Sequence, residues 1–294
     1  MVEIKHRDTG AVIRTIEADS LIGADLSRAD LIGADLSGAY LTGANLAWAD
    51  LAGAKLTKAN LGRVNLRGAN LRSANLFKAN LAWANLTKAN LRSADLCRAN
   101  LLKGNLRKAD LRGANLHEAD LGWANLGRAN LSKANLYGAN LYGAGFHGAN
   151  LSEAILTRAL LSCMNFSGAN LTLLYRANFS GSNLAEANLA EIRANVFDIL
   201  SLARNEVAGL RLAVVEGRIN GSSYDGTCAC LVGTIAILQG CEYRNVPGIP
   251  IDDTCPAERF FMGIRKGNTP ETNPVSAIVL GWIDEFVATP ATAQ

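Results

Sequence analysis

The chain has 294 residues, of which 19% are charged and 6% aromatic, and its formal net charge is +3. No apolar run approaches the ~18 residues of a transmembrane helix, so the sequence predicts a protein without a membrane span. Residues 1–16 alternate charged and apolar side chains, which is not the pattern of a signal peptide. Six cysteines without framework spacing favour a reduced, cytoplasmic setting.

The first segment of the chain is predicted to form a β-hairpin. Residues 2–7 and 11–17 both alternate apolar and polar side chains, and Asp8-Thr9-Gly10 between them is typical of a turn. We expect this hairpin, residues 1–18, to cap the end of the domain that follows, because an uncovered sheet edge invites association between molecules. A lone surface histidine such as His6 indicates no function.

A strict five-residue repeat follows the hairpin. A leucine, replaced at Phe146 and Phe166, recurs at every fifth position from Leu21 to Leu171, with an alanine two residues before nearly every one and mostly Asn or Asp between them. Five is neither the helical nor the strand period. A chain that turns a corner once per pentad points every leucine inward and leaves the next two residues in water. The Asn or Asp side chain can then bond to the backbone of the turn.

This Ala-(Asn/Asp)-Leu-X-X pattern resembles the pentapeptide-repeat family over residues 19–196. The resemblance implies an all-β solenoid, a right-handed quadrilateral β-helix with four pentads per coil, in which residues 20 apart stack on one face. Coils at the ~4.8 Å spacing of paired strands would build a rod of roughly 40 Å. Its interior would be filled by leucine, without a pocket of ligand size.

Charge varies along the chain and around the rod. Residues 17–50 carry a net charge of −5, residues 55–133 a net +11 and residues 134–294 a net −4. At intervals of 20 the basic residues fall into columns, and three columns are the candidate binding residues: Arg72, Arg92 and Arg112; Lys58, Lys78 and Arg98, continued by Glu118; and Arg63, Trp83, Lys103 and Trp123. A fourth face carries Arg67, Lys88, Arg107, Lys108 and Arg128.

Two interpretations of these columns stay open. They can form a binding surface for a polyanion, such as nucleic acid, an acidic protein or anionic lipid. Arginine and tryptophan also anchor protein interfaces. Alternatively, lysine and arginine only keep the rod soluble, which the presence of bases on all four faces favours.

The repeat becomes irregular after residue 145. Gly145, Ile155 and Leu160 replace the polar residue of the pentad, and three residues are inserted before Ala177. Apolar side chains at outward positions usually mark a contact. The predicted contact residues, either within the chain or in a dimer, are Tyr142, Ile155, Leu160, Leu173, Leu174, Tyr175, Trp282 and Phe286.

Residues 197–287 are expected to form a small, mostly helical C-terminal domain, followed by a flexible tail at 288–294. Apolar spacing and helix-stop residues predict its elements. They are a helix at 199–216 with Asp198 as its cap, a short helix or strand at 228–238, a loop at 244–256, a short helix at 256–264 and an amphipathic helix at 274–287.

Four cysteines in this domain raise the question of a zinc site. Cys228, Cys230, Cys241 and Cys255 lack the paired C-x2-C spacing of zinc ligands, so buried free cysteines are favoured over a metal. The sequence also shows no nucleophile elbow, phosphate loop or other catalytic constellation. We therefore predict neither a catalytic site nor a cofactor.

The predicted function is that of a non-enzymatic interaction protein, with the C-terminal domain capping the rod and mediating homodimer or partner contacts. A protein partner is favoured, and nucleic acid bound by the basic middle is the alternative. Some pentapeptide-repeat proteins mimic duplex DNA with an acidic rod and modulate a type II topoisomerase such as gyrase. The basic middle of this chain has the opposite charge, which disfavours that alternative.

Overall fold

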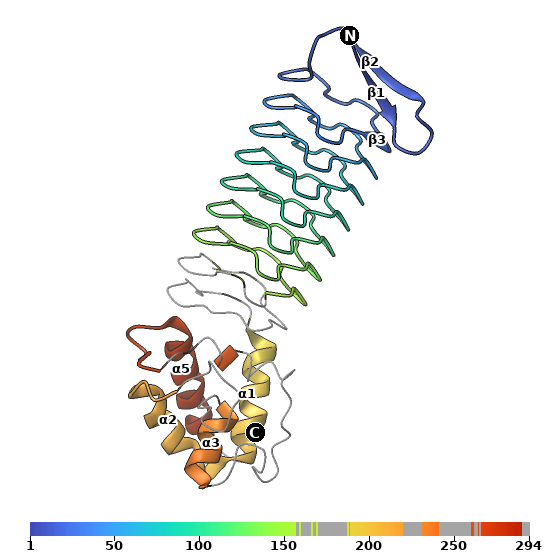
Figure 1. Ribbon diagram of the computed structural model, residues 1–294. Helices are drawn as coiled ribbons and strands as arrows, with labels where there is room; N and C mark the ends of the chain where they lie inside the picture. The colour runs from blue at the N-terminus through green and yellow to red at the C-terminus, as the bar shows by residue number, and fades with distance from the viewer. Residues whose placement is uncertain are drawn as a thin grey trace.

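The computed structural model describes residues 1–156, 189–219, 231–240 and 266–289, together with positions 159, 166, 169, 187, 260, 261 and 264. A long rod of stacked coils carries a β-hairpin at its N-terminal end, and helices lie beyond its other end (Figure 1). This division follows the change from pentads to helical apolar spacing in the sequence.

Each coil of the rod contains 20 residues. Parallel bridges join residues 20 apart along the whole stack, from Asp25 with Asn45 to Asn135 with Ile155. Four pentads therefore make one turn, and residues 21–156 form nearly seven coils. The spacing of 20 residues that the family resemblance implies is therefore the spacing between paired residues of neighbouring coils.

Leucine and alanine fill the interior of the rod. From Leu26 to Leu156 every residue at the leucine position is at most 3% exposed. Burial of each such side chain contributes ~2 kcal/mol. Phe146 and Phe166 occupy one column, and their rings stack with centroids 5.3 Å apart. The buried apolar residues form one cluster that includes the hairpin, the coils and the helices.

Every corner of a coil is a tight turn, and the residue two positions after the leucine has a positive φ there. The alanine N–H donates to the leucine carbonyl three residues before it, as from Ala44 to Leu41 at 3.0 Å. Glycine adopts this conformation without strain, and Gly43 does so at φ 69°. Arginine, lysine and tryptophan take the same position elsewhere, including Trp83 at φ 62°. The Trp83 N–H also donates to Leu102 O in the next coil at 2.9 Å, so hydrogen bonds join the corners along the rod.

The polar residue of the pentad connects neighbouring coils. The Oδ1 atom of Asn65 accepts from the backbone N–H of Arg67 at 3.3 Å, as predicted for the turn. Its Nδ2 atom donates to Asn45 Oδ1 at 2.9 Å, and Asn85 Nδ2 donates to Asn65 Oδ1 at 3.3 Å. This amide ladder between coils was not predicted.

The N-terminal hairpin forms as predicted and pairs with the first coil. Strand β1 (Val2–His6) pairs antiparallel with β2 (Val12–Ile16), and its other edge pairs with β3 (Ala34–Asp35). Ile4 is 1% exposed and belongs to the buried cluster of the rod. The hairpin thus occupies a sheet edge that no preceding coil covers.

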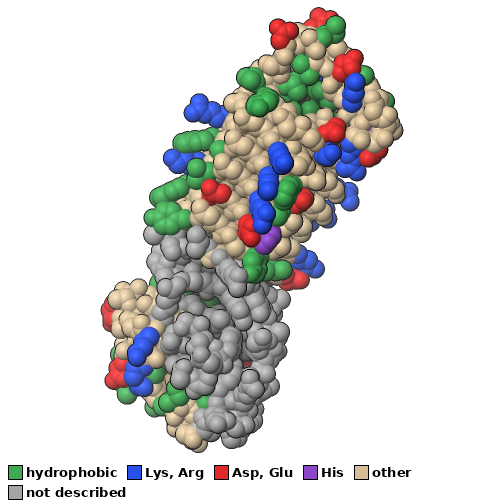
Figure 2. Space-filling model, in the orientation of Figure 1, with side chains coloured by type: hydrophobic (Ala, Val, Ile, Leu, Met, Phe, Trp, Pro, Cys, Tyr) green, Lys and Arg blue, Asp and Glu red, His purple; other side chains and the backbone are tan. Residues whose placement is uncertain are grey.

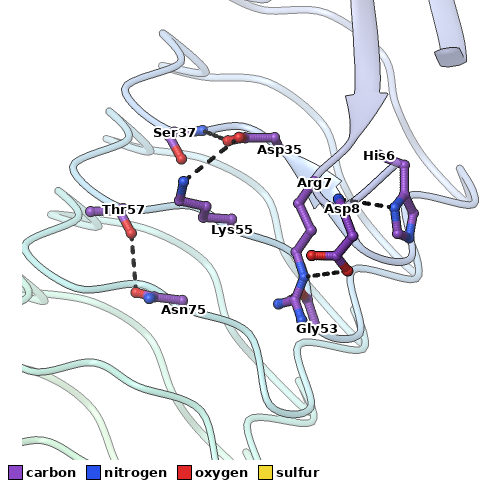
Figure 3. A network of polar contacts seen from close by, with 9 residues as sticks. All are labelled: His6, Arg7, Asp8, Asp35, Ser37, Gly53, Lys55, Thr57 and Asn75. Carbon is purple, nitrogen blue, oxygen red and sulfur yellow. Dashed lines mark hydrogen bonds and ion pairs between the residues drawn. The ribbon is translucent and has the colours of Figure 1, made fainter. Parts of the chain in front are cut away.

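Polar contacts fix the hairpin against the coils (Figure 3). The guanidinium of Arg7 donates to Gly53 O at 2.6 Å, and His6 Nδ1 accepts from the Asp8 N–H at 3.2 Å. The His6 ring lies against Gly33, where a Cβ atom would come within 2.5 Å of Nε2. His6 therefore has a structural role.

The C-terminal region is helical. Its described elements are α1 (Ala190–Leu202), the 3-10 turn η1 (Arg204–Glu206), α2 (Val207–Val215), α3 (Leu231–Gln239) and α5 (Pro274–Ala288). Helix α2 packs against α3 and α5, and α1 packs against α5. Two ion pairs add to these contacts, Arg211 to Asp284 at 2.6 Å and Arg193 to Glu285. No helix among the described residues is long and apolar enough to cross a membrane.

The start of the helical region differs from the prediction. The single helix predicted at 199–216 is wrong, because the backbone breaks at Ala203 (φ −123°, ψ 42°) between α1 and α2. Asp198 lies inside α1 and is not a cap. Helix α1 also begins at Ala190, within the range assigned to the solenoid, because Ile192, Val196 and the residues after them bury one helical face.

The structure confirms the last predicted helix, at 274–287, as α5. Asn273 caps α5, since its Oδ1 accepts from the N–H groups of Val275 and Ser276 at 2.9 and 3.0 Å, and Pro274 is the first helical residue. Residues 228–238 were predicted to form either a short helix or a strand, and their described part is helix α3. Of the predicted helix at 256–264, Phe260, Phe261 and Ile264 are described; the two phenylalanines are helical, and Ile264 is not. The loop at 244–256, the four cysteines and most of the tail lie outside the described residues.

Candidate functional site

The four corners of the coils carry different side chains. We name them in chain order by their residues: the tryptophan corner (Arg63, Trp83, Lys103, Trp123), the lysine corner (Arg67, Lys88, Arg107, Lys108, Arg128), the arginine corner (Arg72, Arg92, Arg112, Lys133) and the mixed corner (Lys58, Lys78, Arg98, Glu118). Backbone hydrogen bonds between coils stack each column, as from Ser73 N to Arg92 O at 2.9 Å and from Ser93 N to Arg112 O at 3.0 Å.

Acidic side chains pair with bases at the mixed and arginine corners. Arg98 Nε donates to Glu118 Oε2 at 2.7 Å, and Arg112 Nε donates to Asp110 Oδ1 at 2.8 Å. These hydrogen bonds hold the pKa of Glu118 and the pKa of Asp110 below their ordinary values. Figure 2 shows basic side chains in a column along the rod with acidic ones beside it. The positive charge of these two corners is therefore partly neutralised.

The tryptophan corner presents large apolar surfaces to solvent. Trp83 is 54% exposed and Trp123 is 57% exposed. Together with Lys103 they line an open hollow of about 690 Å³. The Nζ atom of Lys103 lies 4.5 Å from the ring centroid of Trp83, within cation–π range. The rod was predicted to have a filled interior and no pocket of ligand size, and this hollow on its outer surface was not predicted.

Trp123 packs over a glycine of the next coil. A Cβ atom at Gly143 would lie 2.7 Å from the Trp123 indole. Tyr142 contacts the same indole edge-on, with ring centroids 5.4 Å apart. Trp48 lies on Gly68 in the same way. The sequence signal for this packing is a tryptophan followed 20 residues later by glycine, which the expectations above do not include.

The side of the rod between the tryptophan and lysine corners carries no acidic residue in the middle coils. The stretches 63–67, 83–88, 103–108 and 123–128 cross one side of the rod between the tryptophan and lysine corners, and they contain no Asp or Glu. Among the described ion pairs, none involves the seven cations of this side: Arg63, Arg67, Lys88, Lys103, Arg107, Lys108 and Arg128. We call it the basic side. Basic residues occur on every face of the rod, but the faces differ. The basic side combines these cations with two exposed indoles.

No group of three or more His, Cys, Asp or Glu side chains within the described ranges could hold a metal ion. Burial raises the pKa of the Cys97 thiol, which lies on the mixed corner and is only partly exposed. His117 lies next to Tyr137, with ring centroids 5.3 Å apart.

The predicted contact residues fall into three groups. Tyr142 and Ile155 are each 44% exposed on the rod. Phe286 is buried among the helices, where it meets the Phe197 ring edge-on at 5.4 Å, and Trp282 lies 5.3 Å from the Phe260 ring. The remaining four, Leu160, Leu173, Leu174 and Tyr175, lie outside the described residues.

Comparison with protein families gives one match. A family model described as pentapeptide repeats matches in eight copies between residues 20 and 173, in the ranges 20–57, 44–81, 54–92, 74–113, 89–128, 114–152 and 149–173. The matched residues span more than half of the chain, from the first coil into the irregular pentads. No curated protein matches the chain.

Solved structures with similar repeats come from several sources. HetL of the cyanobacterium Nostoc sp. strain PCC 7120, described as involved in heterocyst differentiation regulation, is 35% identical over 58% of this chain and 85% of its own, with a TM-score of 0.28. Rfr23 of the cyanobacterium Cyanothece 51142 is 31% identical over 37% of this chain and 82% of its own, with a TM-score of 0.31. QnrB1, described as a plasmid-mediated fluoroquinolone resistance protein, is 18% identical over 61% of this chain and 94% of its own, with a TM-score of 0.42.

Proposed function

The chain belongs to the pentapeptide-repeat family, and on this basis we propose that it is a non-enzymatic interaction protein whose rigid rod presents a surface to a macromolecular partner. One observation carries the proposal. The coils are filled by leucine and alanine, and every corner holds its side chains at a fixed interval along the rod. Such a scaffold supplies an ordered surface rather than a chemical centre.

The proposal also covers the fold of the rod, the role of the helical region at its end and the cellular compartment of the protein. The right-handed quadrilateral β-helix of the family is supported by the 20-residue interval of the parallel bridges. Helix α1 extends the buried cluster through Ile192 and Val196, which supports a capping role for the helical region. We assign homodimer contacts, or contacts with a partner additional to the one on the rod, to that region. The cysteine usage supports the cytosol as the compartment.

A second candidate function is polyanion binding by the middle coils. The basic side favours it, because its stretches contain no Asp or Glu, its cations form none of the described ion pairs, and a long line of positive charge attracts polyanions. The gyrase-modulating alternative receives no such support, since the acids of residues 17–50 cover only the first coils.

A capture experiment with matched surface variants tests the interaction role. The full chain, a basic-side variant (Lys88→Gln, Lys108→Gln, Arg128→Gln) and a mixed-corner variant (Lys58→Gln, Lys78→Gln) would each be cross-linked in a nuclease-treated lysate. We assign the partner surface of the rod to the basic side, and therefore expect a partner that the wild type and the mixed-corner variant retain and the basic-side variant loses. Equal capture by all three would contradict the assignment to the basic side. Absence of any captured partner with and without nuclease would contradict the interaction role itself.

A further inference from the structure

Two exposed tryptophans of the basic side require an explanation. Trp83 and Trp123 are more than half exposed, although tryptophan is highly buried on average in folded proteins. Both also have positive φ values, 62° and 58°, which cost an L-residue about 1 kcal/mol. The same column has glycine at Gly43 and Gly143, so the turn does not need an indole. Backbone geometry does not account for these side chains, and the packing of Trp123 against Gly143 and Tyr142 still leaves more than half of that indole exposed.

The spacing of the tryptophans suits a linear ligand. They occupy the same corner two coils apart, roughly 10 Å at the ~4.8 Å strand spacing. Lys103 occupies the coil between them and completes the open hollow. A ligand that runs parallel to the rod would meet an aromatic surface, a cation and a second aromatic surface in turn.

The rest of the basic side adds charge along the same direction. Lys88 and Lys108 stack at the lysine corner with Arg107 beside them, and Arg128 continues the column one coil further. The chain crosses from Lys103 to Arg107 in four residues, so both corners border the same side. The exposed indoles and the cations therefore border the same side of the rod.

We propose that the basic side binds single-stranded nucleic acid, with phosphates on the lysine corner and unpaired bases stacked on Trp83 and Trp123. This inference rests on the polyanion candidate and names its ligand. Non-specific single-strand sites combine a positive groove with aromatic side chains on which bases stack. A duplex keeps its base faces in its own stack, and an acidic peptide lacks regularly spaced aromatic faces. Three coil spacings give roughly 15 Å of site, room for about five nucleotides at 3.4 Å each.

The experiment measures binding of a fluorescein-labelled 12-nucleotide oligo(dT) by anisotropy in a salt series, with a duplex of equal length beside it. The full chain binds the single strand more tightly than the duplex. The variant Trp83→Ala with Trp123→Ala binds the single strand at least ~10-fold more weakly, since one stacked base contributes about that factor. Its salt slope is unchanged. The variant Lys88→Gln with Lys108→Gln loses ~0.7 in slope for each phosphate contact removed.

A matched control lies on another corner. Phe77 and Lys78 form a similar aromatic–cation pair at the mixed corner, with Nζ 5.2 Å from the ring centroid. Phe77→Ala leaves the affinity for oligo(dT) unchanged. Far-UV circular dichroism checks that each variant folds. Quenching of wild-type tryptophan fluorescence by the oligonucleotide gives a readout that needs no variant.

The outcomes separate this inference from the polyanion candidate. If only the lysine variants weaken binding, and oligo(dT) does not quench the tryptophans, the inference is overturned and polyanion binding stands. Tighter binding of the duplex than of the single strand also overturns it. Absence of binding to either nucleic acid at low salt overturns both.

Discussion

At the scale of single residues, the corner glycines show how one side chain depends on the next coil. Gly143 and Gly43 share a corner column and have φ values of 68° and 69°. A Cβ atom at Gly143 would meet the Trp123 indole at 2.7 Å, whereas none of the neighbours of Gly43 lies within 4 Å of such an atom. The two positions therefore differ in the tryptophan that packs over one of them.

We predict that Gly143→Ala destabilises the protein more than Gly43→Ala does. The control loses about 1 kcal/mol from the positive φ alone. Gly143→Ala loses this and must also displace Trp123, which changes the near-ultraviolet circular dichroism of the indole. Urea unfolding measures the difference. Equal losses with an unchanged indole signal would show that Trp123 does not depend on this glycine.

The Asp110–Arg112 pair gives a pH prediction. The hydrogen bond from Arg112 lowers the pKa of Asp110 from 3.8. A carboxyl group with a lowered folded-state pKa adds stability above its unfolded-state pKa and loses it as the pH falls through the folded value. We therefore expect the urea midpoint of the wild type to fall more between pH 5 and pH 2 than that of Asp110→Asn. The difference corresponds to at most about 1 kcal/mol, because the pair is partly exposed. An equal fall in both would refute the assignment.

At the scale of elements, the amide ladder makes its own prediction. Asn65 uses its Oδ1 for the Arg67 N–H and its Nδ2 for Asn45. Asn65→Ala leaves several partners unsatisfied and costs about 2 kcal/mol. Asn65→Asp keeps the acceptor, as Asp25 does for Asn45 at 3.0 Å, and costs roughly half as much. Chemical denaturation of both variants tests the order, and a reversed order would exclude the ladder as the cause.

The sequence predicted the elements whose signal is local. The inward leucines, the hairpin turn at Asp8-Thr9-Gly10 and the start of α5 at Pro274 all follow from short patterns. The start of α1 was missed because Ala194-Asn195-Val196 imitates a pentad while Ile192 and Val196 also fit a helical face. The difference between the corners was only partly visible. The Arg98–Glu118 column could be read at intervals of 20, but the Arg112–Asp110 contact depends on side-chain conformation.

At the scale of the whole molecule, we expect the rod and the helices to unfold with different sensitivities. Ile283 in α5 is fully buried, and Ile283→Ala costs ~2–5 kcal/mol. In repeat proteins each unit contacts only its neighbours. The substitution should therefore speed hydrogen exchange in the helices and leave residues 80–130 unchanged. Leu91→Ala, also fully buried, should do the reverse. If either variant accelerated exchange throughout the chain, the molecule would unfold as one cooperative unit.

Because four pentads make one coil, the columns of the rod stay aligned only when its length changes by a multiple of four pentads. Removal of one pentad between Trp83 and Trp123 would shift Trp123 by a quarter turn onto the column of Glu118, so the two indoles would no longer share a face. Removal of four pentads would shorten the rod by one coil spacing, ~4.8 Å, and keep every column intact. Changes of length in such a rod are therefore of two kinds, those that scramble its surface pattern and those that only change its extent.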